Sequence, residues 1–204
     1  PAGVIGVRSG TQMAASDGLT VTLLGRGGHG SRPHSTIDPI VMAAATVMRL
    51  QTVVSREIDP REMAVVTVGS IHAGLKNNII PAEAKLELSL RYPNEKARED
   101  VMARVERIVH AEAAASGAEE PPIISVDHTL PPTINDVDAT ARLTAAWDNA
   151  FGAGTVVDPG MFTGSARTIW RWPRGTAWKA RRAPLTRCRT IFPGRASSTA
   201  TCPM

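Results

Sequence analysis

Between residues 19 and 130 the chain alternates two hydrophobic periods, and their order restricts the fold more than any other feature of the sequence. A period of two residues is typical of a strand with one buried face, whereas a period of about 3.6 indicates an amphipathic helix. The strand pattern is clearest where Ala84, Leu86, Leu88 and Leu90 alternate with polar residues. Further strand patterns cover 63–71, 19–24 and 123–126, and helix patterns cover 38–55 and 94–116.

Both expected helices carry start signals. Asp38 precedes Pro39, and a carboxylate followed by proline favours a helix beginning at the proline. Asn94 can cap the second helix in the same way. The order strand, helix, strand, strand, helix, strand predicts an α+β fold, a ferredoxin-like βαββαβ sandwich with a four-stranded antiparallel sheet and two helices on one face. Residues 138–151 predict one more amphipathic helix outside this unit.

The formal net charge of +4 combines two regions of opposite sign. Residues 1–158 hold 14 Lys and Arg against all 19 Asp and Glu, a net charge of −5. Residues 159–204 hold 9 Lys and Arg and no acidic residue, a net charge of +9. Because an acidic body does not attract phosphate, we expect no nucleic-acid partner.

Cysteine usage and hydropathy bear on the compartment. Both cysteines, Cys188 and Cys202, lie in the basic region, so the rest of the chain can form no disulfide. No run approaches the roughly 18 apolar residues of a membrane span, and no signal peptide is evident. We therefore expect a cytoplasmic protein without membrane contact. The start at Pro1 suggests a fragment.

A glycine-rich loop follows the first strand and raises a nucleotide-binding alternative. Gly25, Gly27 and Gly30 satisfy G-x-G-x-x-G, the spacing by which backbone amides approach a pyrophosphate. In such sites the helix opens inside the motif, but here it is expected only at Pro39. No acidic residue lies about 20 positions further on to bind a ribose. A tight glycine turn is the preferred interpretation over a nucleotide-binding oxidoreductase.

Several polar residues are candidates for a site, although their spacing alone does not define one. His29 and His34 share the glycine loop, but a metal centre needs at least three convergent donors and none are nearby. Taken by itself, Asn78 favours a turn. Arg91 lies at the end of a polar strand face, which favours a solvated charge unless the fold brings it together with the loops that carry His29 and Asn78.

Six segments stand in an order that resembles a known superfamily. They are 25–34 (GRGGHGSRPH), 38–40 (DPI), 50–56 (LQTVVSR), 59–60 (DP), 64–69 (AVVTVG) and 78–81 (NIIP). This order is similar to that in the zinc-dependent amidohydrolase and metallopeptidase superfamily, which includes hippurate hydrolase, N-acyl-L-amino-acid amidohydrolases and indoleacetyl-amino-acid hydrolases. The resemblance covers about residues 3–164.

The resemblance implies a division of the chain. Residues 1–18 are expected to end a first segment of an α/β catalytic domain, 19–131 to form a lid and dimerisation domain, and 132–164 to return into the catalytic domain. The family binds a divalent metal, zinc with manganese or cobalt as alternatives, through ligands that lie mostly upstream of Pro1. We therefore expect no metal in this chain and no activity from it alone.

The resemblance also implies residue roles. His29 matches a histidine that polarises the scissile amide carbonyl in the partner subunit, the expected catalytic contribution of this chain. Asn78 and Arg91 match groups that hold the substrate's carboxylate. The implied partners are a second copy, bound through the lid, and a small N-acyl-amino-acid or peptide substrate. A non-catalytic homodimerisation module is the alternative.

After Gly164 the family pattern is lost. One permitted set of codons for Ser165 to Trp170, read two nucleotides on, encodes Gly-Glu-Asp-Tyr-Leu, which resembles the family's continuation. We therefore expect residues 165–204 to be an out-of-frame, disordered tail without evolved function.

Overall fold

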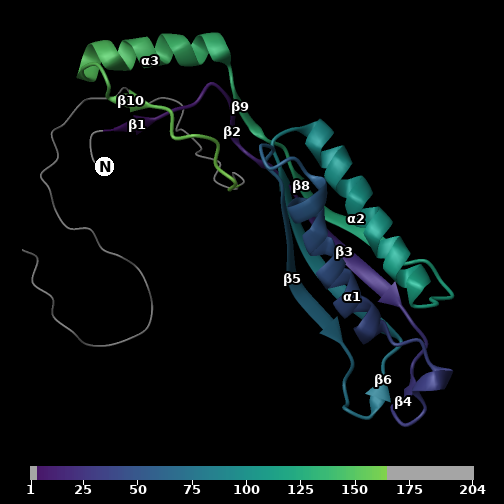
Figure 1. Ribbon diagram of the computed structural model, residues 1–204. Coiled ribbons are helices and arrows are strands. Elements are labelled where there is room, and N and C mark those ends of the chain that lie inside the picture. Colours follow the sequence, from purple (N-terminus) through teal and green to yellow (C-terminus); the bar gives the residue numbers. More distant parts are fainter. Residues whose placement is uncertain (1–3, 165–204) are drawn as a thin grey trace, which may run out of the picture. The chain divides into compact units, whose positions relative to one another are not determined.

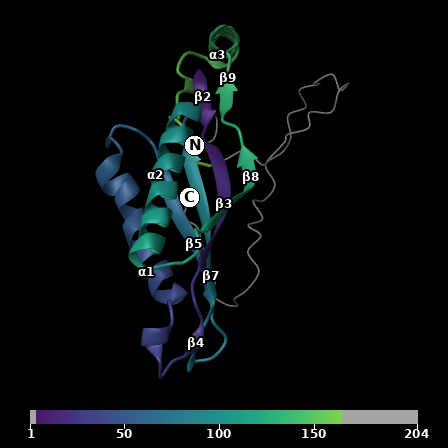
Figure 2. The ribbon, with the colours of Figure 1, turned by 90° about the vertical axis from the view of Figure 1, so that its right-hand side faces the viewer.

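A computed structural model describes residues 4–164, and its centre is a four-stranded antiparallel sheet covered by two helices (Figure 1). The strand order is β5-β7-β3-β8. Along the chain the elements are β3 (Ala15–Leu24), α1 (Pro39–Thr52), β5 (Val65–Ala73), β7 (Glu83–Tyr92), α2 (Glu95–Ala115) and β8 (Ile123–Leu130). Figure 2 shows both helices on the same face of the sheet. The ferredoxin-like prediction is confirmed.

The core lies between the helices and the facing side of the sheet. In β7 the alternation is complete, since Ala84, Leu86, Leu88 and Leu90 are buried while Lys85 and Glu87 on the other face are exposed. The other buried apolar residues come from the neighbouring strand and both helices: Leu19, Val21, Leu23, Met42, Leu50, Val101, Val105, Ile108 and Val109. In the two central strands the opposite face is largely polar, with Thr20 and Thr22 beside Lys85 and Glu87. The predicted caps are confirmed, with Asp38 accepting from Ile40 N and Asn94 from Ala97 N.

The first strand begins at Ala15, four residues before the expected Leu19. The sequence pattern missed this extension because Ser16 and Asp17 are polar yet buried. Asp17 Oδ2 accepts a 2.6 Å hydrogen bond from Arg98 Nε on α2. Burial by itself raises the pKa of Asp17, but the nearby hydroxyls of Tyr92 and Thr129 and the Arg98 guanidinium bring that pKa below its usual value. A buried carboxylate is tolerated here because it has a cationic partner.

Two other boundaries differ from the expected ones. Helix α1 ends at Thr52, and the chain continues in a wider, π-helical turn at Val53–Glu57. Strand β5 covers Val65–Ala73 rather than 63–71, and its register against β7 shifts between Val68 and Ser70. Such a bulge changes which side chains face the core, and a period-two pattern cannot anticipate it.

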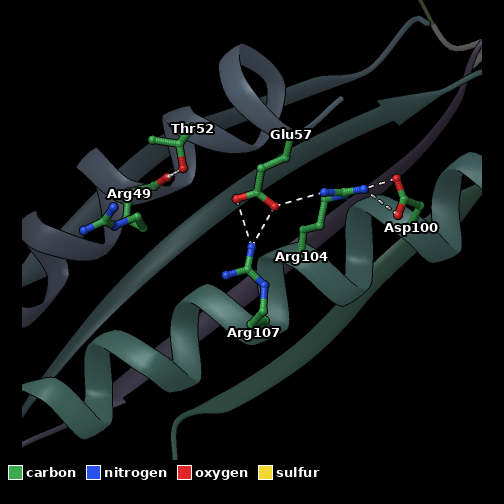
Figure 3. A network of polar contacts seen from close by, with 6 residues as sticks. All are labelled: Arg49, Thr52, Glu57, Asp100, Arg104 and Arg107. Atoms are coloured by element: carbon green, nitrogen blue, oxygen red, sulfur yellow. Dashed lines mark hydrogen bonds and ion pairs between the residues drawn. The ribbon is translucent and has the colours of Figure 1, made fainter. Parts of the chain in front are cut away.

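An ion-pair network joins the end of α1 to α2 (Figure 3). Glu57 accepts from Arg107 Nη2 at 2.7 and 2.9 Å and from Arg104 Nη1 at 3.0 Å, and Arg104 also binds Asp100. The hydrogen bond from Arg107 lowers the pKa of Glu57. Burial acts in the opposite direction, and the hydrogen bond from Arg104 lowers this pKa further. The π-helical turn therefore carries Glu57 to a position where it bridges the two helices.

The segments that flank the sheet domain are hydrogen-bonded to one another. Strand β1 (Ile5–Gly6) pairs with β10 (Val156–Val157), and β2 (Gly10–Met13) pairs with β9 (Thr133–Asn135). The helix expected at 138–151 is α3, Val137–Phe151, and none of its residues is buried. No helix within 4–164 is long and apolar enough to cross a membrane. The expected out-of-frame tail, 165–204, lies outside the described residues.

Candidate functional site

A small two-stranded ribbon at one end of the sheet domain, called the tip below, brings two candidate residues together. Strand β4 (Gly28–His29) pairs with β6 (Ile79–Ile80), with His29 opposite Ile79. Gly30 N donates to Asn78 O at 2.8 Å, which continues the pairing. Figure 1 shows β4 and β6 side by side, beyond the ends of the four long strands. The glycine loop and the Asn78 loop thus form one structural unit.

The glycines of this loop provide room for close backbone contact. A Cβ on Gly27 would lie 2.8 Å from Ile80 O and 3.1 Å from Pro81 C, and a Cβ on Gly30 would lie 3.2 Å from Asn78 O. Neither glycine has a positive φ, so steric room rather than backbone freedom requires glycine.

The amides of the glycine loop are also used within the protein. Gly25 N donates to Ala82 O at 2.8 Å, and Arg26 N donates to Ile37 O at 2.9 Å. Helix α1 begins only at Pro39, well after the motif. Because these amides already have protein acceptors and no helix N-terminus faces the loop, the geometry disfavours the nucleotide alternative.

The surroundings of His29 define which ring nitrogen can donate. Ser31 N donates to His29 Nδ1 at 3.2 Å, and Ser31 Oγ lies 2.8 Å from the same atom. A backbone N–H can only donate, so Nδ1 is the acceptor and the neutral ring carries its proton on Nε2. The side chain is exposed at the tip. His29 therefore presents an N–H donor to solvent, as polarisation of a carbonyl oxygen requires.

Arg91 lies at the other end of the domain, called the base below. It pairs with Ser16 at the start of β3, whereas the tip adjoins Glu83 at the start of β7. Eight residues of extended strand separate Glu83 from Arg91, a span of ~27 Å. Within the described residues, Arg91 Nη1 is buried and has no hydrogen-bond partner. One lid therefore brings His29 and Asn78 together but holds Arg91 apart from them.

Two further points concern metal binding and the position of His34. Among residues 4–164, no three His, Cys, Asp or Glu side chains converge in a way that could hold a metal ion. The described residues therefore do not fit a metal centre. His34 lies in the short turn Pro33–Ser35 next to the ribbon and is exposed.

With this geometry established, comparisons identify the family. A model of the peptidase dimerisation domain matches residues 15–116, half of the chain. An N-acyl-L-amino acid amidohydrolase of Geobacillus stearothermophilus is 34% identical over 192 residues, covering 89% of this chain and 51% of that protein. Hippurate hydrolase of Campylobacter jejuni is 34% identical over 146 residues, covering 72% and 38%. The chain thus spans about half or less of these relatives.

Solved structures give the same result. A Bacillus subtilis protein described as a dinuclear metal binding peptidase of the M20 family superposes with a TM-score of 0.59 at 27% identity, covering 81% of this chain and 39% of that protein. The chain carries a dimerisation domain of ferredoxin-like form. It belongs to the peptidase dimerisation domain family of the M20 amidohydrolases and peptidases.

The sequence patterns missed the ribbon itself. Strands β4 and β6 have two residues each, too short for any period to be visible. The sequence feature that could have indicated the ribbon is the glycine-rich loop 25–30, because glycines often mark a place where another backbone segment approaches closely.

The glycine contacts predict a selective effect of one methyl group. Gly27→Ala should force the ribbon strands apart, costing about 1–3 kcal/mol of local stability. Hydrogen exchange of the Gly25 and Gly30 amides should quicken accordingly, while the sheet amides keep their protection. Gly69→Ala is the matched control, because its Cβ would meet nothing closer than Glu87 O at 3.7 Å. Equal exchange in the two variants would contradict the proposed role of Gly27.

Proposed function

We propose that this chain is the lid and dimerisation portion of a metal-dependent amidohydrolase that cleaves N-acyl-amino-acid or peptide amide bonds. The observation that carries the proposal is the His29 donor at the tip, held by Ser31 on a ribbon that the family places in its dimerisation domain. Helix α3 supports it, since an amphipathic helix without buried residues needs a further layer to pack against. The chain alone is expected to be inactive.

The chemical contribution of the chain is electrostatic. His29 Nε2–H donates to the scissile carbonyl oxygen in the partner's active site and stabilises the negative charge that develops there. Asn78, next to it in the ribbon, holds the substrate's carboxylate. The described residues supply no metal ligand set, so the nucleophile comes from other parts of the enzyme.

Arg91 fits the same site only if two chains contribute. Its base position is where β3 begins and β8 ends, so it lies where its own chain enters and leaves the lid. The tip, by contrast, projects away from those connections. Each composite site would then take His29 and Asn78 from one subunit and Arg91 from the other, with the guanidinium on the carboxylate.

The two lids are proposed to pair through β5 and α1. Among the strands described within 4–164, β5 and β8 are the two edges of the sheet, and either could accept a second copy. Helix α1, which contacts β5, exposes Val41 (65%) and Met48 (72%) seven residues apart on one face. The exposed face of α2 is instead charged, with Lys96, Glu99, Glu106 and Arg107. An apolar stripe beside a free edge favours the β5 side.

Charge on the α1 stripe should therefore dissociate the dimer. Met48→Asp is expected to raise the dimer dissociation constant by ~100-fold, because the carboxylate would be buried at the contact. Sedimentation velocity of wild type and variant measures this. The matched control is Val126→Asp on the β8 edge, where Val126 is 47% exposed. A monomeric wild type, or dissociation by Val126→Asp alone, would contradict the assignment.

The catalytic role is tested in a hybrid enzyme, with residues 15–130 replacing the corresponding lid of the Geobacillus amidohydrolase. His29→Ala should lower kcat/KM for an N-acyl amino acid by ~10²–10³-fold, the usual effect of losing one oxyanion donor. His29→Gln should restore part of the rate, since its amide can donate. His34→Ala, on the adjacent turn, serves as the control and should be neutral. Full activity of the His29→Ala hybrid would exclude the role.

A further inference from the structure

A hollow of about 600 Å³ opens at the tip, between the loop after β5 and the start of β7. Its apolar lining comes from Ala73, Leu75, Ile79, Pro81 and Ala82, and the polar residues His72 and Glu83 line it as well. Lys76 and Lys85 also line it, and Lys85 pairs with Glu83 at 3.4 Å. The volume lies in the range of small-molecule sites. Leu75 is fully exposed in the isolated chain, so a ligand here would remove apolar surface from water.

The pairing of β4 with β6 places His29 beside a residue that lines this hollow. Residues directly opposite in an antiparallel pair project from the same face, with Cβ atoms about 4.5–5.5 Å apart. His29 is opposite Ile79, and Ile79 lines the hollow. A carbonyl oxygen bound by His29 Nε2 would therefore lie within a few atoms of the apolar wall.

We propose that the hollow binds the apolar acyl group of the substrate whose amide carbonyl His29 polarises; this inference rests on the proposed function. In an N-acyl amino acid, the scissile amide joins two groups. The amino-acid side carries a carboxylate, which Asn78 and Arg91 are proposed to hold. The acyl side is the apolar one, and it is bonded directly to the carbonyl carbon. The hollow thus matches the acyl group in polarity and in distance from the carbonyl.

The hollow would then contribute to acyl-group selection in the partner's active site. Transfer of each methylene from water to an apolar surface favours binding. Because the walls come from this domain, variation at Leu75 or Pro81 changes acyl preference without altering His29 or Asn78. Longer acyl groups would bury more of this apolar surface than short ones, and so would bind more tightly.

The 204-residue chain can test this without catalysis. It is titrated with N-acetyl-, N-butanoyl-, N-hexanoyl- and N-octanoylglycine, and backbone amide shifts are followed by NMR. The shifts should concentrate in 72–85 and at His29, and the dissociation constant should fall about two- to fourfold for each added methylene. An affinity independent of acyl length would overturn the proposal.

Matched variants separate the hollow from general apolar binding. Leu75→Ser should weaken N-octanoylglycine binding by about tenfold, because it removes an apolar wall. The fold should be unaffected, since Leu75 buries nothing. Val126→Ser, the control on the far edge strand, should leave the affinity unchanged. An equal loss in both variants would overturn the proposal, and so would hollow signals that shift with protein concentration alone, which would indicate a second copy as occupant.

The binding titration and the hybrid-enzyme assay together distinguish failure of the acyl site from failure of the proposed catalytic role. Length-dependent binding in the hollow, combined with full activity of the His29→Ala hybrid, would show an apolar-ligand site but reject the catalytic role of His29, and with it the assignment of the ligand as the acyl group beside His29. Acyl-length independence, combined with an inactive His29→Ala hybrid, would reject the acyl site and leave the catalytic role standing.

Discussion

The close backbone contact between the glycine loop and the chain after Asn78 is the constraint on which the site depends. Any Cβ at Gly27 would lie too near Ile80 O for the two segments to pair. With glycine, β4 and β6 form a ribbon that is continuous with the sheet domain. The ribbon fixes His29 opposite Ile79, and Ser31 then sets which ring nitrogen donates. Orientation of the donor follows from packing of the main chain rather than from a cluster of catalytic side chains.

The long central strands separate two chemically different ends. At the tip are an exposed histidine donor, an asparagine loop and an apolar hollow. At the base, where the chain enters and leaves the domain, are Arg91 and the ion pair between buried Asp17 and partly exposed Arg98. A rigid sheet keeps these ends apart, so a site needing both requires two copies. In the proposed enzyme, this would give a physical reason for joining dimerisation and substrate binding in one domain.

The fold was largely predictable because each long element has a clear period and a start signal, as in the alternation of β7 and the Asp38 and Asn94 caps. The extension of β3 was not, because the burial of Asp17 depends on Arg98, 81 residues away. His29 and Asn78 were assigned roles in the candidate site only through the resemblance of the chain to a known family, and those roles remain predictions. The separation of Arg91 from Asn78 was predictable, because the expected strand with Ala84, Leu86, Leu88 and Leu90 lies between them.

The composite site is tested most directly by mixing subunits. Hybrid enzymes carrying His29→Ala and Arg91→Ala, each nearly inactive, are combined in equal amounts, dissociated and allowed to re-pair. If His29 and Arg91 of one site come from different subunits, each mixed dimer regains one intact site, and activity should return to about one quarter of wild type. If both residues serve the same site from a single lid, every site lacks one of them. Activity of the mixture would then stay at the level of the separate variants, which would contradict the two-chain site.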